Sequence, residues 1–289
     1  MVSESSQTSG PDFICVGMAK AGTQWLYDQV KAHPAFWLPP VKGMHYLGGG
    51  DAPGMAGVRK SLARAARQSK KPDAEDRDYA FLIEANAMRK APRDLTRYAS
   101  LFRYKGDQLS GDVCATYAGL TSDEIADVAK YLPSVKILLL VRDPVSRAWS
   151  RICMDYRQGG FDPDLLEDEA AFREFLTTTS WLSTERSCPT SIVQRWATSA
   201  PTVQFRTFLL DDISRNANEA RAEILRYLGA DPEGGVLAPS YNRKAGNEKL
   251  ELTDSVKGIL VEHFADELRA SAQMFGGGAR EWPVRYGVA

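Results

Sequence analysis

The sequence of 289 residues contains no apolar run close to the roughly 20 residues that a membrane-spanning helix needs. Its first residues, MVSESSQTSGPD, lack the basic and apolar regions of a signal peptide, so we expect a cytoplasmic location and no membrane span. Cysteine is scarce, and none of the four cysteines lies in a paired spacing, which disfavours a zinc site or a disulfide framework. We interpret Cys15, Cys114, Cys153 and Cys188 as reduced residues that mostly pack in the core.

An excess of charge of either sign is also missing, since 36 basic residues face 37 acidic ones. No overall electrostatic field would therefore attract the chain to nucleic acid or to an anionic membrane, and any anion site must be local. The apolar fraction of 44% is sufficient for a full core. We expect a disordered polar tail over residues 1–11 and one domain over residues 12–289, and composition leaves the oligomeric state open.

A strand, a turn and a helix are indicated by the stretch FICVGMAKAGTQWLYDQVKAHP. The apolar run FICVG is typical of a buried parallel strand. From Gly22 to Lys31, Trp25, Leu26 and Val30 recur at helical spacing. Pro34 then ends the pattern by restricting the residue before it.

A second strand and helix follow at KILLLVRDPVSRAWS, where Asp143 and Pro144 supply an N-cap and a first-turn proline. The apolar helix face comprises Val145, Ala148, Trp149, Ile152, Cys153 and Tyr156, and the polar face comprises Ser146, Arg147, Ser150 and Arg151. Further on, TVQFRTFLL predicts a strand, and two helices are expected, one closed by Gly229 and one capped by Thr253. Strands that alternate with helices predict an α/β fold, with a central parallel sheet flanked by helices.

Residues 48–78 shift toward glycine, alanine and charge, which indicates an insertion or mobile flap that contains one basic helix. Its basic residues could bind an acidic acceptor, but a solvated helix is the interpretation we favour.

The first turn, GMAKAGTQ, has the composition of an anion site. Unpaired N–H groups and the aligned peptide dipoles attract anions to a helix N-terminus. Gly22 allows close backbone approach, Thr23 adds a hydroxyl and Lys20 adds a positive charge, which suits a phosphate or a sulfate. The lysine precedes the second glycine, whereas in the nucleoside-triphosphate motif G-x-x-x-x-G-K-[ST] it follows, so an ATP-dependent kinase or phosphotransferase is the weaker alternative.

Together the two turns resemble those of the sulfotransferases that use 3′-phosphoadenosine-5′-phosphosulfate (PAPS). The first segment resembles the 5′-phosphosulfate motif of that family, and LLLVRDPVSRAWS resembles its 3′-phosphate motif R-D-P-x-x-R-x-x-S. KGMHYL and GDVCATYAGL are similar to looser segments of carbohydrate-type and other members, K-E-x-H-F-F and G-E-K-x-P-x-Y-L. The resemblance extends from about Phe13 to Trp282 and implies a P-loop-like sulfotransferase fold.

The resemblance also implies roles for individual residues. Lys20 would contact the bridging oxygen and the sulfuryl group, and Arg142 and Ser150 would bind the 3′-phosphate. The 5′-phosphate would be held by the turn residues Ala21, Gly22, Thr23 and Gln24, and a late loop with Arg243, Lys244 and Gly246 would close over the 3′-phosphate. PAPS would be the donor and 3′-phosphoadenosine-5′-phosphate (PAP) the product, with no metal required as the family performs this reaction.

The resemblance leaves two possibilities for the base. His45 is the best candidate because imidazole titrates near neutral pH. The glutamate of K-E-x-H-F-F is Gly43 here, so His45 acts alone or a carboxylate from elsewhere, Glu84 or Asp112, replaces it. Lys42 is a candidate to orient the sulfuryl group.

Several residues have simpler interpretations. Arg147 is expected to be a surface or ion-pair residue, Trp25 and Trp149 to pack in the core, and His33 and His263 to be structural. The acceptor would be a hydroxyl or an amine of a carbohydrate or small natural product, with a lipid as a further option. Besides the kinase, a PAP-binding protein that has lost catalysis remains an alternative, because Gly43 occupies the position of the family's base.

Overall fold

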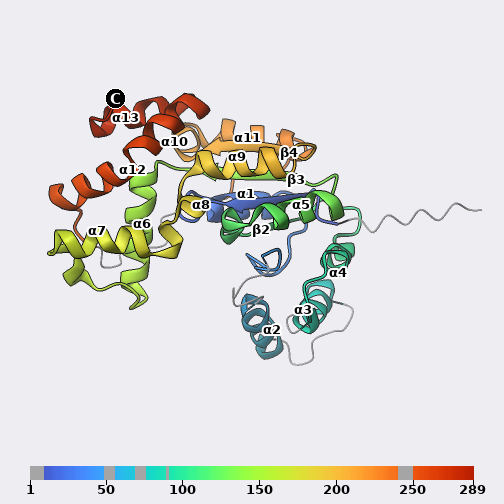
Figure 1. Ribbon diagram of the computed structural model, residues 1–289. Helices are drawn as coiled ribbons and strands as arrows, with labels where there is room; N and C mark the ends of the chain where they lie inside the picture. Colours follow the sequence, from blue (N-terminus) through green and yellow to red (C-terminus); the bar gives the residue numbers. More distant parts are fainter. Residues whose placement is uncertain (1–9, 49–55, 69–75, 89–90, 240–249) are drawn as a thin grey trace, which may run out of the picture.

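The computed structural model describes residues 10–48, 56–68, 76–88, 91–239 and 250–289. At its centre is a parallel sheet of four strands: β1 (Phe13–Gly17), β2 (Gly111–Val113), β3 (Lys136–Val141) and β4 (Gln204–Leu209). The order across the sheet is β2-β1-β3-β4, which puts β1 and β3 in the middle (Figure 1). The predicted α/β fold with a central parallel sheet is confirmed.

The two central strands coincide with the two apolar runs of the sequence. Every residue of β1 is buried, and so is every residue of β3 after Lys136. Helices cover both faces of the strands, which explains why neither strand alternates between apolar and polar residues. β4 lies at the edge of the sheet, and its first residues alternate between exposed and half-buried. β2 escaped prediction because three residues are too few to show a period.

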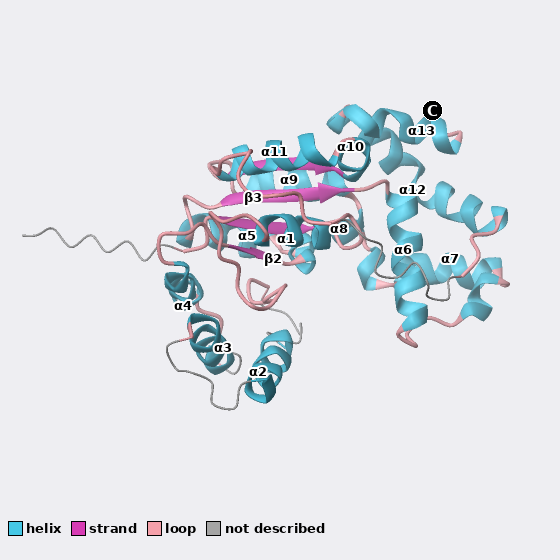
Figure 2. Ribbon diagram, turned by 180° about the vertical axis from the view of Figure 1, so that it is seen from behind, coloured by secondary structure: helices cyan, strands magenta, loops and turns pink. Residues whose placement is uncertain are grey.

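Helices cover both faces of the sheet. α5 (Ser122–Tyr131) and α9 (Pro189–Ser199) pack against each other on one face, and α1 (Thr23–Lys31) and α11 (Ala217–Leu228) cover the other (Figure 1 and Figure 2). A second group lies beyond the carboxyl ends of the strands: α6 (Pro144–Arg157), α7 (Glu169–Thr178), α8 (Thr184–Ser187), α10 (Leu210–Arg215), α12 (Asp254–Phe275) and α13 (Glu281–Tyr286).

A third group of helices lies on the β2 side of the sheet (Figure 1). It contains α2 (Ala56–Gln68), α3 (Arg77–Met88) and α4 (Leu95–Ser100). Short 3₁₀ turns complete the described chain: η1 (Leu101–Lys105), η2 (Ala115–Gly119), η3 (Pro163–Leu166), η4 (Ser180–Leu182) and η5 (Gly277–Arg280).

The expected helix boundaries are confirmed by cap geometry. Asp143 accepts a hydrogen bond from Ser146 N at 2.8 Å and begins α6. Thr253 Oγ1 accepts from Val256 N at 3.3 Å and begins α12. Gly229 ends α11 with a φ of 91°, a left-handed conformation that costs glycine little.

One segment prediction needs adjustment, and another is confirmed in part. Gly10 and Pro11 were assigned to a disordered tail, but Pro11 is buried and Lys105 Nζ donates to Gly10 O at 3.0 Å. The basic helix expected inside residues 48–78 is present as α2. The rest of that predicted flap lies partly outside the described residues, as does the tail before Gly10.

Buried apolar residues form one cluster that extends from Phe13 to Trp282. In the described part of the chain, no helix is long and apolar enough to cross a membrane. Cys15, Cys114 and Cys153 are buried, Cys188 is half-buried, and none of the four forms a disulfide among the described residues, so most of them pack in the core as expected.

Candidate functional site

The turn between β1 and α1 presents unpaired helix N–H groups. Gly22 stands at the N-cap with a left-handed φ of 95°, and it supplies no side-chain cap hydrogen bond. The first N–H groups of α1 therefore have no capping side chain and can receive an anion. Lys20, in the same turn, has a φ of 71°, a conformation that is uncommon for a residue with a Cβ and that recurs at functional sites.

The turn between β3 and α6 lies beside the first turn, because β1 and β3 are neighbours in the sheet. Arg142 follows β3 directly, and its Nη1 donates to Lys20 O at 3.1 Å. This hydrogen bond joins the two turns that the sequence singled out. Burial lowers the pKa of Arg142, although the nearby carboxylates of Asp143 and Asp211 raise it. An arginine remains charged after such a shift and can bind a phosphate through two N–H groups.

A cavity of about 570 Å³ opens at these two turns. Lys20, Arg142 and Ser150 all line it, so the structure brings together three of the predicted donor-binding residues. Trp149 also lines the cavity while it packs against the core, so the expectation of core packing alone was incomplete.

The remaining predicted residues of the first turn lie at the start of α1. Ala21 is fully buried, and Thr23 Oγ1 accepts a hydrogen bond from Lys42 Nζ at 3.1 Å. Gln24 Nε2 donates to Asp28 Oδ1 at 2.9 Å. Lys42 is thus brought to the N-terminus of α1 from a separate segment. Arg243, Lys244 and Gly246, predicted to close over the 3′-phosphate, lie outside the described residues.

His45 lies three residues after Lys42 and also has a left-handed backbone, with a φ of 55°. Its Nδ1 is 3.0 Å from Thr116 Oγ1, so the other ring nitrogen, Nε2, is not used in this contact. A Cβ added at Gly43 would lie 3.1 Å from His45 Nε2, and Gly43 has a φ of 78°. The imidazole therefore occupies the space into which a larger residue at position 43 would extend.

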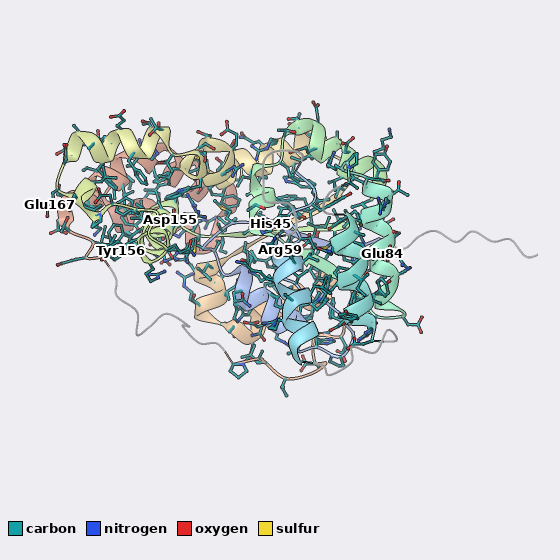
Figure 3. All side chains as sticks on the ribbon, turned by 90° about the horizontal axis from the view of Figure 1, so that it is seen from below. His45, Arg59, Glu84, Asp155, Tyr156 and Glu167 are labelled. Carbon is teal, nitrogen blue, oxygen red and sulfur yellow. The ribbon has the colours of Figure 1, made fainter. Side chains whose placement is uncertain are left out.

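The two carboxylates considered as alternative bases have structural partners. Glu84, on α3, accepts hydrogen bonds from both terminal nitrogens of Arg103 and from Tyr104 Oη, and it lies apart from His45 (Figure 3). The Arg103 and Tyr104 hydrogen bonds lower the pKa of Glu84, against the opposing effect of desolvation, which is the largest single influence. These contacts hold Glu84 within the group of helices α2, α3 and α4 rather than at the two turns.

Asp112 is buried on β2 between aromatic residues. Tyr117 Oη donates to its Oδ2 at 2.7 Å, Tyr98 Oη donates at 3.2 Å, and Met44 N donates to Oδ1 at 3.3 Å. Burial raises the pKa of Asp112, while these hydrogen bonds oppose the rise. Both carboxylate oxygens of Asp112 thus accept hydrogen bonds from the protein. These contacts favour a role in positioning the segment around Met44 over a role as the base.

Arg147 is buried and has no ion-pair partner among the described residues, so the expectation of a surface or ion-pair residue was wrong. Its side chain is 1% exposed, and Nη2 donates to Ser187 Oγ at 2.6 Å. Burial lowers the pKa of Arg147 to about 10. The prediction that Arg147 lies on an exposed polar face of α6 is wrong because α8 covers that position. Helical spacing alone does not reveal such a contact.

The two histidines outside the site have structural surroundings, as expected. His33 is buried, with Nε2 2.9 Å from Asp231 O, and its Nδ1 accepts from Ala35 N at 3.1 Å. Burial lowers the pKa of His263 on α12. Trp25 packs against the core.

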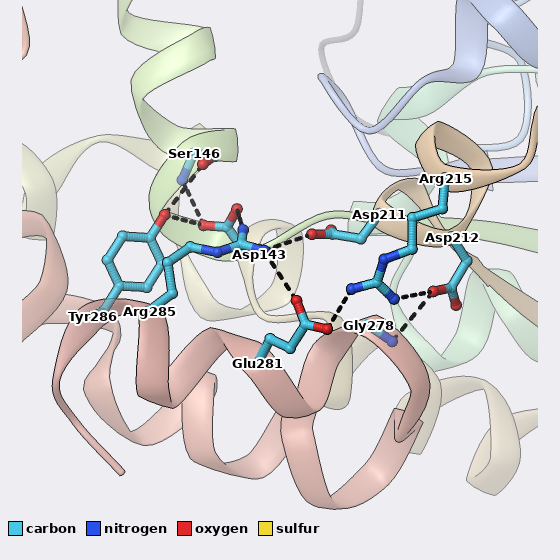
Figure 4. A network of polar contacts seen from close by, with 9 residues as sticks. All are labelled: Asp143, Ser146, Asp211, Asp212, Arg215, Gly278, Glu281, Arg285 and Tyr286. Carbon is cyan, nitrogen blue, oxygen red and sulfur yellow. Dashed lines mark hydrogen bonds and ion pairs between the residues drawn. The ribbon is translucent and has the colours of Figure 1, made fainter.

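Residues near the C-terminus also reach the site, which the sequence did not predict. Tyr286 Oη donates to Asp143 Oδ1 at 2.8 Å, and Arg285 lies 3.6 Å from Asp143 Oδ2 and 3.0 Å from Asp211 Oδ1 (Figure 4). Arg157, Lys257, Arg285 and Tyr286 all line the cavity. The one local signal was that Arg157 falls two helical turns after Ser150 on the same helix face.

Comparisons with known proteins concern the family and the fold of the chain. The family model that matches residues 11–229 is described as the sulfotransferase family. This chain is similar to the crystal structure of a sulfotransferase from Alicyclobacillus acidocaldarius, with a TM-score of 0.61 and 19% identity over 94% of this chain and 98% of that one. It is also similar to the sulfotransferase domain of an olefin synthase from Synechococcus PCC 7002, with a TM-score of 0.49 and 18% identity over 88% and 94% of the two chains. No curated protein sequence matches the chain.

Proposed function

Because the chain belongs to the sulfotransferase family, we propose that it transfers a sulfuryl group from PAPS to a hydroxyl or amine of a carbohydrate or small natural product. The observation that carries the proposal is the cavity at the ends of β1 and β3, where Lys20, Arg142 and Ser150 meet. The hydrogen bond from Arg142 to Lys20 O fixes the distance between the two turns. One ligand with anionic groups at both ends fits this arrangement.

The donor would lie with its phosphosulfate end at the N-terminus of α1. Gly22 leaves the helix N–H groups uncapped, and Ala21, Thr23 and Gln24 complete the turn around the 5′-phosphate. Arg142 and Ser150 would bind the 3′-phosphate from the second turn. Arg243, Lys244 and Gly246 keep their proposed place over the same phosphate.

In the transfer step, the acceptor oxygen or nitrogen forms a bond to sulfur while the bond from sulfur to the phosphate oxygen breaks. The electron pair stays on that oxygen, so PAP leaves with one more negative charge, which Lys20 stabilises. Lys42, hydrogen-bonded to Thr23 at the start of α1, is suited to orient the sulfuryl group. No metal ion takes part in the proposed step.

His45 would take the proton from the acceptor. When Nδ1 carries hydrogen and donates to Thr116 Oγ1, Nε2 is unprotonated and can act as a base. The contacts of Glu84 and Asp112 with arginine and tyrosine side chains make each a weaker candidate.

The donor assignment is tested by thermal-shift titration with PAP, with ADP, and with ATP plus magnesium. A ligand that binds only the folded state raises the melting temperature by mass action. We expect PAP to give the largest shift, and Arg142→Ala to remove most of the difference between PAP and ADP because that difference comes from the 3′-phosphate. Arg226→Ala, an exposed arginine on α11, is the matched control and should behave like the wild type.

A shift with ATP and magnesium but none with PAP would contradict the proposal and favour the kinase. PAP binding without any turnover of PAPS would favour the alternative that Gly43 suggests, a PAP-binding protein without catalysis.

A further inference from the structure

Three cations from outside the two sequence motifs also face the cavity. Arg157 lies in the last turn of α6, Lys257 in the first turn of α12, and Arg285 on α13. With Lys20 and Arg142 they bring the number of positive side chains around one cavity to five. The two motifs alone provide only two of these five positive side chains.

These three cations differ in their partners. Arg285 is paired with Asp143 and Asp211, so its charge is compensated inside the protein (Figure 4). Within the described ranges, no carboxylate lies within ion-pair distance of Arg157 or Lys257. Lys257 Nζ has only the ring of Tyr286, with 6.0 Å to its centroid. Arg157 and Lys257 are half-buried, and positive side chains that share a cavity repel one another unless a bound anion neutralises their charge.

The position of Arg157 suits the phosphate end of the cavity. Ser150 and Arg157 are two helical turns apart on one face of α6, about 10 Å along the axis at 1.5 Å per residue. Ser150, Cys153 and Arg157 all line the cavity, so the three residues share the side of α6 that faces it.

Lys257 approaches the same space from another element. α12 packs against α6, and Leu250 and Leu252, which precede α12, line the cavity together with Lys257. The first turn of α12 therefore forms a wall of the cavity that faces α6. Tyr286 also lines the cavity, and the Nζ of Lys257 lies near its ring. The hydroxyl of Tyr286 is held by its hydrogen bond to Asp143.

We infer that Arg157 and Lys257 bind the 3′-phosphate of the donor together with Arg142 and Ser150. The inference rests on the proposed function and adds two binding residues from outside the motifs, one of them from helix α12. It also assigns the cavity to a bisphosphorylated nucleotide, because Arg157 and Lys257 add two positive charges to those of Lys20 and Arg142 around one cavity.

The test is isothermal titration of PAP and of ADP into the wild type, Lys257→Met and Arg157→Met. Each methionine keeps an apolar stem and removes the charge. We expect each variant to lose ~tenfold or more in PAP affinity, as for a charge-assisted hydrogen bond, and to lose less than ~threefold in ADP affinity. Lys257→Arg should retain most of the PAP affinity. Lys130→Met, which removes an exposed lysine on α5, is the control and should bind PAP like the wild type.

The outcomes separate the two proposals. A wild-type protein that does not bind PAP would overturn the proposed function itself. PAP binding by the wild type that is unchanged in Lys257→Met and Arg157→Met would overturn only the present inference, as would equal losses for PAP and ADP. Melting temperatures without ligand check that both variants fold, and we expect no loss because neither side chain has an ionic partner among the described residues.

Discussion

Position 43 shows how one residue changes the chemistry available to the site. Gly43 has a left-handed φ of 78°, and a Cβ there would lie 3.1 Å from His45 Nε2. A glutamate at this position would therefore carry backbone strain and would displace the imidazole. The backbone around residue 43 therefore disfavours a glutamate there and leaves the space to the imidazole of His45.

The roles proposed for Lys20 and His45 lead to a kinetic prediction. Lys20→Met should lower the rate of PAP formation from PAPS ~100-fold or more because the leaving phosphate loses the positive charge of Lys20. His45→Ala should lower it by a similar or larger factor because the acceptor loses its base. Transfer to water, followed by chromatography of PAP, measures this rate without an identified acceptor.

PAP affinity, measured beside the rate, distinguishes catalysis from binding. Both variants should bind PAP within ~threefold of the wild type, since charge on the leaving group and proton transfer matter mainly in the transition state. If His45→Ala retains the wild-type rate, another group is the base. If Lys20→Met loses affinity as much as rate, Lys20 serves mainly to bind the donor.

At the scale of elements, Asp143 joins two helices that are far apart in the sequence. Its carboxylate caps α6 through Ser146 N and also accepts from Tyr286 Oη of α13 (Figure 4). Burial, and then the charge of Asp143, raise the pKa of Tyr286 to about 12, so the phenol remains a donor at neutral pH. A helix as short as α13 is not stable alone, so contacts of this kind hold it in place.

Tyr286→Phe should therefore destabilise the protein. Removal of the hydroxyl leaves one oxygen of the buried Asp143 with fewer donors, and we expect a loss of about 1 kcal/mol in the free energy of unfolding. Urea denaturation measures the loss. Tyr131→Phe, which removes an exposed hydroxyl on α5, is the control and should change stability by much less. Equal stability of Tyr286→Phe and the wild type would show that α13 is held by packing alone.

At the scale of the whole molecule, the buried apolar residues form one cluster, to which the sheet, the α2–α4 lobe and the C-terminal helices all contribute. Val58 of α2 and Phe81 of α3 are fully buried in it, and so is Trp282 of α13. A shared core couples the stability of these groups of helices, because exposing one side of the cluster exposes the other.

We therefore expect one cooperative thermal unfolding transition. The calorimetric enthalpy should equal the van't Hoff enthalpy, and circular dichroism and tryptophan fluorescence should report the same midpoint. A separate transition at lower temperature would show that the α2–α4 lobe unfolds independently. Reducing agent should not change the midpoint, since the cysteines are free thiols.

Local features were predictable from residues close together in the chain. β1 and β3 are continuous apolar runs, and Asp143, Thr253 and Gly229 end or begin helices through hydrogen bonds or backbone angles within a few residues. The turn around Lys20 was recognisable for the same reason, because a strand, a glycine and a helix start follow one another directly.

Contacts between distant segments required the folded chain. The burial of Arg147 depends on α8, the tyrosines around Asp112 come from two other segments, and the partners of Glu84 lie on η1. The same holds for Lys257, which reaches the cavity only because α12 packs against α6. Residues adjacent in sequence thus specified the strands, the caps and the turn around Lys20 through short-range sterics and hydrogen bonding. The packing of helices across the sheet decided which charges meet, because electrostatics and burial depend on distances in space that sequence spacing does not set.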